Sequence, residues 1–127
     1  MTADTHKLVV HSEKPFNAEP PLDRLRANFV TDQADFYVRS HGDTPTVDPE
    51  NFVLSVSGLA KTPLALSLDD LRRFPECTVE AVMQCAGNRR ADMLKVRPVS
   101  GDPWSAGAIG NARWTGVRLR DVLDRAG

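Results

Sequence analysis

Hydrophobic and polar residues alternate along two segments in the middle of the chain. One side of segment 52–57 carries its large apolar residues, Phe52, Leu54 and Val56. A period of two residues is typical of a strand with one covered face, so a short strand is expected there. The same alternation over 77–84 predicts a longer strand, and a brief apolar stretch over 35–39 predicts a third.

Helical periodicity is confined to short segments. Ser67 is followed three residues later by Asp70, the pattern of a capping box, which predicts a short helix that ends before the next proline. Apolar residues at helical spacing over 119–126 predict a terminal helix, with Gly127 in position to cap it. A helical turn is also expected around 21–28. Short helices combined with short strands indicate an α+β fold.

Proline and glycine mark the connections between these elements. Three prolines in 12–21 predict an extended arm rather than a helix, because proline fixes its own backbone and biases the preceding residue toward extended geometry. Segment 40–49 has the glycine, prolines and turn-forming polar residues of a loop. The glycine-rich segment 100–111 is expected to be a second loop, whose backbone approaches another part of the molecule closely.

Composition narrows the class of protein. The chain has 127 residues, of which 41% are hydrophobic and 26% charged, enough for one domain or part of one. We expect a disordered segment over 1–11 and the N-terminal part of a domain over 12–127. Sixteen lysines and arginines against seventeen aspartates and glutamates give a net charge of −1, which argues against a nucleic-acid-binding protein. Without a long apolar run or a signal-like start, a cytoplasmic location and no membrane contact are expected.

Cys85 has the surroundings that most suggest chemistry. It ends the predicted strand 77–84, and Arg89 and Arg90 follow it in a turn. Nearby cations favour the thiolate, which is both a nucleophile and a soft metal ligand, although a lone cysteine is more often a structural thiol. Cys77 lies about 25 Å away along an extended strand, too far to act as a resolving thiol. The cysteine spacing does not fit a zinc site either, and both thiols are expected to be reduced.

Two further segments contain candidate binding residues. Arg39 ends a predicted strand, where an arginine can hold an oxyanion through two parallel hydrogen bonds. His41 can donate to an anionic cofactor, although residue types alone favour a solvated arginine and an ordinary loop histidine. Trp114 is expected in the core, as most tryptophans are, whereas Trp104 lies in the glycine-rich loop.

Four stretches of the chain form an ordered set of motifs. They are 14–21 (KPFNAEPP), 36–42 (FYVRSHG), 82–90 (VMQCAGNRR) and 104–119 (WSAGAIGNARWTGVRL). Together they resemble the molybdopterin-binding catalytic domain of the sulfite oxidase family, which includes assimilatory nitrate reductases. Four motifs in order are more specific than any one of them. The resemblance implies the α+β fold of that family, with mixed sheets, short helices and long loops.

The resemblance implies a role for each candidate residue. Cys85 would bind molybdenum beside the sulfurs of molybdopterin, since sulfur ligands suit a soft redox metal. Arg39 and Arg90 would hold the substrate oxyanion, and Trp104 would wall its pocket. The residues that would line the cofactor are Tyr37, Val38, Arg39, Ser40 and His41. The implied reaction is oxidation of sulfite to sulfate by oxygen-atom transfer, with an unknown electron acceptor.

The chain also departs from the pattern of the family. Ser40 stands where many members have asparagine, and no haem domain is expected in this chain. Further cofactor and substrate residues of the family, and its dimerisation domain, would lie beyond Gly127. We therefore expect this chain to supply the metal ligand and part of the anion pocket, to retain the molybdenum cofactor poorly, and to dimerise only in a longer form.

Two alternatives stay open at this point. A nitrate reductase of the same family would share these motifs, which hardly separate the two activities. A methionine sulfoxide reductase of the same fold is disfavoured by the arginine at position 39. The alternative from another class is a non-catalytic, truncated remnant of such an enzyme.

Overall fold

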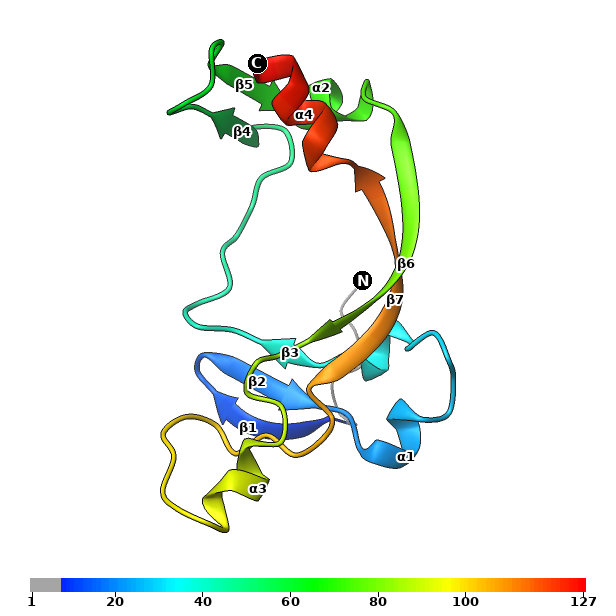
Figure 1. Ribbon diagram of the computed structural model, residues 1–127, viewed down its shortest axis with the longest axis vertical. Coiled ribbons are helices and arrows are strands. Elements are labelled where there is room, and N and C mark those ends of the chain that lie inside the picture. Colours follow the sequence, from blue (N-terminus) through cyan, green and yellow to red (C-terminus); the bar gives the residue numbers. More distant parts are fainter. Residues whose placement is uncertain (1–7) are drawn as a thin grey trace. The chain divides into compact units, whose positions relative to one another are not determined.

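The computed structural model describes residues 8–127, which form two compact units (Figure 1). Within the described residues, the first unit consists of residues 8–44 and Glu80–Arg113, and the second of Pro45–Val79 and Trp114–Gly127. Both units combine short helices with small sheets, so the expected α+β fold is confirmed. Every strand pair with a defined register is antiparallel.

The first unit is built on a three-stranded sheet in the order β1-β2-β3. Strands β1 (Val9–Glu13) and β2 (Phe16–Glu19) form a hairpin, and β3 (Val38–Arg39) pairs with the other edge of β2. The helical turn α1 (Leu22–Leu25) and a 3₁₀ turn (Gln33–Asp35) connect β2 to β3. The sheet thereby places the end of β3 beside the hairpin.

Three expectations for this unit need adjustment. The predicted arm over 12–21 is extended, but it is paired in a sheet, because β2 finds partners on both edges. The predicted strand over 35–39 is reduced to β3, since the 3₁₀ turn occupies its beginning. The disorder expected over 1–11 lies outside the described residues for 1–7, whereas residues 9–11 belong to β1.

The second unit contains the sheet β4-β5 and two helices. Strand β4 (Val53–Val56) confirms the alternation in the sequence, and it pairs with β5 (Leu64–Ser67). The sequence reading missed β5 because its apolar run is too short for a periodic signal. Helices α2 (Leu68–Arg72) and α4 (Leu119–Ala126) lie where the sequence predicts them.

The capping box at the start of α2 is present in full. The Ser67 hydroxyl accepts a hydrogen bond from the Asp70 N–H at 3.1 Å, and the Asp70 carboxylate accepts one from the Ser67 N–H at 3.0 Å. Each bond satisfies a backbone donor at the helix end that has no partner within the helix. At the end of α4, Gly127 takes the expected left-handed conformation with φ of 83°.

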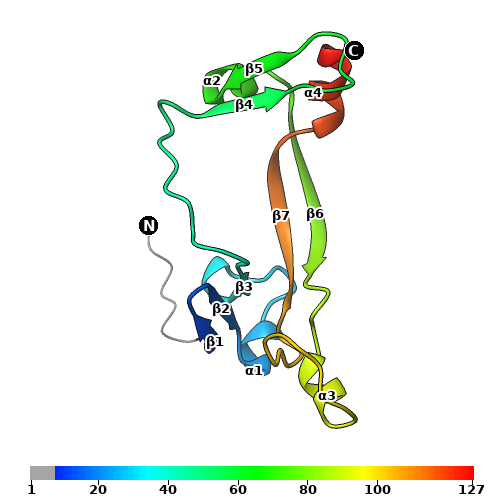
Figure 2. The same ribbon diagram turned by 90° about the vertical axis from the view of Figure 1, so that its left-hand side faces the viewer.

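Strands β6 (Glu76–Gln84) and β7 (Ile109–Val117) pair as a two-stranded ribbon (Figures 1 and 2). Their arrows point in opposite directions in both views. Within the described residues these strands pair only with each other. Trp114 of β7 is 38% exposed, so its predicted place in the core is wrong: a ribbon without a covering layer leaves its side chains open to solvent.

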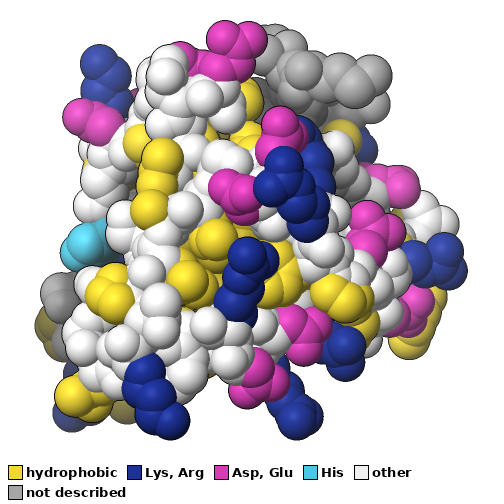
Figure 3. Space-filling model, turned by 90° about the horizontal axis from the view of Figure 1, so that it is seen from above, with side chains coloured by type: hydrophobic (Ala, Val, Ile, Leu, Met, Phe, Trp, Pro, Cys, Tyr) yellow, Lys and Arg dark blue, Asp and Glu magenta, His cyan; other side chains and the backbone are white. Residues whose placement is uncertain are grey.

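The buried apolar core is small, and large apolar side chains remain at the surface. Figure 3 shows hydrophobic side chains gathered among charged ones on the face viewed from above. The second unit has six large apolar side chains that are at least half exposed: Val47, Val53, Leu59, Val79, Leu119 and Leu123. Across residues 8–127, no helix is long and apolar enough to cross a membrane.

Candidate functional site

A cavity of about 330 Å³ in the first unit collects most of the candidate residues. Its lining consists of Pro15, Asn17, Arg39, Ser40, His41, Arg90, Gly101, Asp102 and Trp104. These residues come from the β1–β2 hairpin, from the end of β3, from α3 (Arg90–Leu94) and from the loop before β7. Two arginines against one aspartate give the cavity a cationic character, which favours an anionic ligand.

Arg39 and the two residues after it are held in place at the end of β3. The buried amide of Asn17 accepts a hydrogen bond from the Ser40 N–H at 2.6 Å. The Arg39 guanidinium donates to the Ser40 carbonyl at 2.6 Å and contacts His41 Nδ1 at 3.2 Å. Because arginine only donates, His41 Nδ1 must accept, and its Nε2–H is left as a donor. The segment therefore combines N–H donors from two side chains.

Arg90 occupies a slot formed by glycine backbone. Its guanidinium donates to the Asp102 carbonyl at 2.9 Å. A methyl group added at Gly87 or Gly101 would lie 2.8 Å from a guanidinium nitrogen, so a side chain at either position would displace the guanidinium from this place. Gly101 also has a φ of 102°, a conformation that glycine adopts without strain. The slot fixes the plane of the guanidinium and its N–H donors. A flexible side chain in open solvent would have no such fixed orientation.

The predicted turn before Arg90 is observed, and a short helix follows it. Residues 86–89 form the turn, and α3, which no sequence signal predicted, begins at Arg90. Arg89 precedes this helix with a left-handed backbone, at φ of 65°. Such a conformation is uncommon for a residue with a side chain, and no pattern of apolar residues announces it. It directs the Arg89 side chain to Asp92, at 2.8 Å, in an exposed ion pair.

Trp104 walls the cavity and is also part of the core, with 1% of its surface exposed. Its ring packs edge-on against His11 at 4.9 Å between centroids and against Tyr37 at 6.5 Å. Its predicted location beside Arg39 and Arg90 is therefore observed. A rigid, buried ring forms a wall that excludes water from one side of the cavity.

Cys85 lies beside the cavity, outside its lining among the described residues. The thiol is half-buried, and the Gly87 N–H donates to its sulfur at 3.4 Å. Burial raises the pKa of Tyr37, and electrostatic interaction with the neighbouring Cys85 raises it further. The sulfur is thus partly accessible, next to a residue that contacts Trp104.

The structure therefore places some predicted site residues in the cavity lining and others next to the cavity. Arg39, Ser40, His41, Arg90 and Trp104 share the cavity lining. Tyr37, Val38 and Cys85 adjoin it, and Val38 is paired with Ala18 in the sheet. Their proximity is observed, and their roles in chemistry stay predictions.

Glu19 is a component of the site that sequence reasoning missed. Its carboxylate is 1% exposed and accepts hydrogen bonds from His11 Nε2 at 2.9 Å, Ser105 N at 2.7 Å and Gly107 N at 2.9 Å. Burial alone would raise the pKa of Glu19, but hydrogen bonds from Ser105, His11 and Gly107 lower it below its ordinary value. No local pattern could reveal this, because two of the donors lie 86 and 88 residues away.

The donor set for a metal ion is sparse. Over residues 8–127, no group of three or more His, Cys, Asp or Glu side chains is placed to hold a metal. Cys85 offers a single soft, partly accessible sulfur. A single thiolate suits a metal that arrives with its other ligands on an organic cofactor, so the residues present fit such a group.

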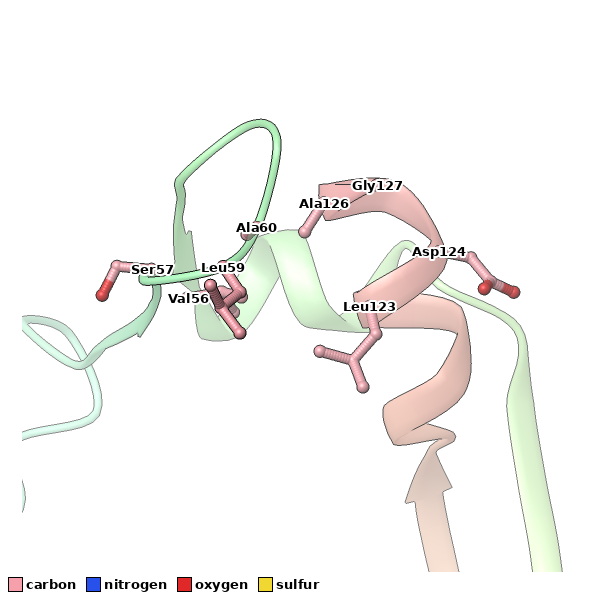
Figure 4. A pocket seen from close by; sticks show the side chains of 8 residues that line it. All are labelled: Val56, Ser57, Leu59, Ala60, Leu123, Asp124, Ala126 and Gly127. Atoms are coloured by element: carbon pink, nitrogen blue, oxygen red, sulfur yellow. The ribbon is translucent and has the colours of Figure 1, made fainter.

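The second unit has a pocket of a different kind (Figure 4). It has a volume of about 530 Å³ and lies between α4 and the loop after β4. Its lining is Val56, Ser57, Leu59, Ala60, Leu123, Asp124, Ala126 and Gly127. Figure 4 shows the Asp124 carboxylate turned away from Leu59 and Leu123. The pocket thus lacks the converging polar groups of the first unit.

Comparison with known proteins now identifies the chain. Residues 41–127 match the family described as the oxidoreductase molybdopterin-binding domain. The chain belongs to this family. It is 52% identical over 121 residues to a sulfite oxidase of Gallus gallus, and 44% identical over 115 residues to a nitrate reductase of Hordeum vulgare. These alignments cover 94% and 89% of this chain, but only 26% and 13% of the two relatives.

A solved structure agrees with the assignment of this molybdopterin-binding domain. The sulfane dehydrogenase SoxCD of Paracoccus pantotrophus has a TM-score of 0.75 at 26% identity, over 94% of this chain and 30% of that one. The sulfite-oxidase-type fold expected from the motifs is therefore confirmed. The domain described here spans about a quarter of the Gallus gallus sulfite oxidase that it matches.

Proposed function

We propose that this chain is part of a molybdenum-cofactor-dependent oxidoreductase that oxidises sulfite to sulfate. The supporting observation is the cationic cavity beside the Cys85 thiol, where Arg39 and Arg90 lie with Trp104. A small oxyanion that approaches a site rich in sulfur and oxygen ligands needs cations to offset the repulsion. The two guanidinium groups meet this need, and they come from segments that the fold holds independently.

Each of these residues has a defined task in the proposal. Cys85 would hold the metal, and residues 37–41 would line the pterin, with His41 donating from Nε2–H. When bound, the cofactor would supply two-electron oxygen-atom-transfer chemistry. Arg39 and Arg90 would bind and orient the oxyanion through paired N–H donors. Trp104 would keep water from one side of the bound anion.

Nitrate reduction is the second candidate. The 44% identity to a nitrate reductase supports it, and a cationic cavity of this size suits nitrate as well as sulfite. Nitrate is planar and donates an oxygen atom, whereas sulfite is pyramidal and accepts one. Both are small anions, so the charge of the cavity alone does not separate them. Sulfite is favoured because the sulfite oxidase of Gallus gallus is more similar to this chain.

The proposal is tested with a matched pair of cysteine variants. Because this chain by itself is expected to retain the cofactor poorly, the longer oxidoreductase of which we propose it is part is produced in cells that make molybdenum cofactor. Its molybdenum content is measured together with sulfite-dependent and nitrate-dependent electron transfer to or from an artificial dye. We expect Cys85→Ser to lose at least about nine-tenths of the bound molybdenum and of the activity, because a hydroxyl is a poor soft-metal ligand. Cys77→Ser removes the other thiol, at the start of β6, and should match the unmodified chain.

Two outcomes would count against the proposal. Equal molybdenum content in both variants would remove the metal-binding role of Cys85. Turnover of nitrate without turnover of sulfite would favour the second candidate.

A further inference from the structure

The buried carboxylate of Glu19 holds a backbone segment that is also bonded to the turn after Cys85 and to the start of α3. Its oxygens accept the N–H groups of Ser105 and Gly107, two positions apart in the loop before β7. A carboxylate held by backbone N–H groups is a strong, charge-assisted contact. Trp104 directly precedes these two donors, so the carboxylate fixes the backbone from which the indole ring projects.

The other side of the same segment is bonded to the elements that carry Arg90 and Cys85. The Ser105 carbonyl accepts from the Arg89 N–H at 2.6 Å, and the Trp104 carbonyl accepts from the Ala91 N–H at 2.9 Å. Both donors flank Arg90 in the chain. Three residues after Ser105, the Ala108 carbonyl accepts from the Cys85 N–H at 2.9 Å. Segment 104–108 therefore connects Glu19 to the residue that walls the cavity, Trp104, and to the backbone beside Arg90 and Cys85.

The fit around the carboxylate is tight. A methyl group added at Gly107 would lie 2.9 Å from Glu19 Oε2 and 2.6 Å from the Pro20 carbonyl oxygen. The third hydrogen bond comes from His11, whose ring packs edge-on against Trp104. The carboxylate is thus fixed by three donors, and the segment has little freedom to move relative to the hairpin.

We propose that Glu19 is a positioning residue for the anion cavity. It acts through the Ser105 and Gly107 N–H groups and places Trp104 and Arg90 in the geometry that binds the oxyanion. The inference rests on the proposed function, because it assumes that the cavity binds an oxyanion. It adds a residue that touches neither the anion nor the metal.

The inference is tested by the sulfate affinity of the 127-residue chain, measured by isothermal titration calorimetry. The decisive result is whether the Glu19→Gln substitution strengthens or weakens sulfate binding. Glu19→Gln removes a negative charge near the cavity, which by electrostatics alone strengthens sulfate binding. Loss of positioning weakens it, because an amide NH₂ opposes the backbone donors. We expect sulfate to bind about tenfold more weakly to Glu19→Gln. Glu13→Gln removes the same charge from an exposed position of the same hairpin, and its affinity should stay within about twofold of the unmodified chain.

A second variant serves if Glu19→Gln does not fold. Glu19→Asp keeps the charge and draws the carboxylate back by one methylene, so it cannot span all three donors. We expect about threefold weaker sulfate binding and a shifted Trp104 indole N–H resonance in the NMR spectrum, assigned with Trp104→Phe. Unchanged or tighter sulfate binding in a folded Glu19 variant would overturn the inference. If the unmodified chain binds no sulfate, the proposed function fails, and an unmoved indole resonance in Glu19→Asp then overturns the positioning role separately.

Discussion

Replacing Arg90 by lysine separates the geometry of the cavity from its charge. The Arg90 guanidinium lies in the glycine slot and donates one N–H to the Asp102 carbonyl at 2.9 Å. Its remaining donors stay available to an anion. A lysine keeps the positive charge but has a compact ammonium on a flexible stem, without the planar set of donors. The substitution therefore removes orientation and leaves the long-range attraction in place.

The size of the effect follows from the contacts that are lost. A hydrogen bond to a charged group contributes about 1.5 to 3 kcal/mol, and lysine recovers part of this through its own N–H groups. We expect Arg90→Lys to weaken sulfate binding by about 1.5 kcal/mol, which is roughly tenfold in Kd. Arg90→Ala loses the charge as well, so its loss should be about a hundredfold and its affinity should depend less on salt.

The assay is sulfate titration by calorimetry at two ionic strengths. Arg89→Lys is the matched control, because Arg89 adjoins Arg90 but pairs with Asp92 in solvent, with 69% of its side chain exposed. Its Kd should equal that of the unmodified chain. An Arg90→Lys variant with unchanged affinity, or an equal loss in Arg89→Lys, would refute the assigned role of the guanidinium slot.

Three other predictions concern stability, measured as the free energy of unfolding in urea. Ser67→Ala should lower it by about 1 kcal/mol through loss of the helix cap, with Ser57→Ala unchanged; equal values would argue against the cap. Glu19 has a pKa below its ordinary 4.5, so its carboxylate stabilises the fold above that pH and loses this contribution as the pH falls through the lowered value. The chain should therefore lose stability below pH 4.5 relative to Glu19→Gln, and parallel pH profiles would contradict this. Trp104→Ala should cost about 3 to 5 kcal/mol and Trp114→Ala about 1 kcal/mol or less, because only the first ring is buried; similar losses would be inconsistent with the burial.

The candidate site was only partly accessible to sequence reasoning. Residue types alone favoured ordinary roles for Arg39, His41 and Cys85, and the ordered motifs were needed to select them. The motifs also selected Arg90 and Trp104, which the structure brings into one cavity. Motifs do not report distance, however. Cys85 lies beside that cavity rather than in its lining, because its turn is bonded to the Ala108 backbone.

Local signals predicted the elements whose structure depends on neighbouring residues. The capping box of α2, the spacing of α4 and the alternation in β4 and β6 each involve positions within one turn or one strand. Such interactions form between residues that are close in the sequence, so the local amino-acid pattern is sufficient to predict them.

Only the folded chain reveals the elements and contacts that depend on distant partners. The hairpin in the proline-rich arm and the exposure of Trp114 follow from which strands pair. Glu19 is an ordinary acidic residue in the sequence, and it becomes a buried anchor because the fold brings donors from 86 and 88 residues away. The physical reason is that burial and long-range hydrogen bonding are properties of a three-dimensional arrangement, which no local periodicity encodes.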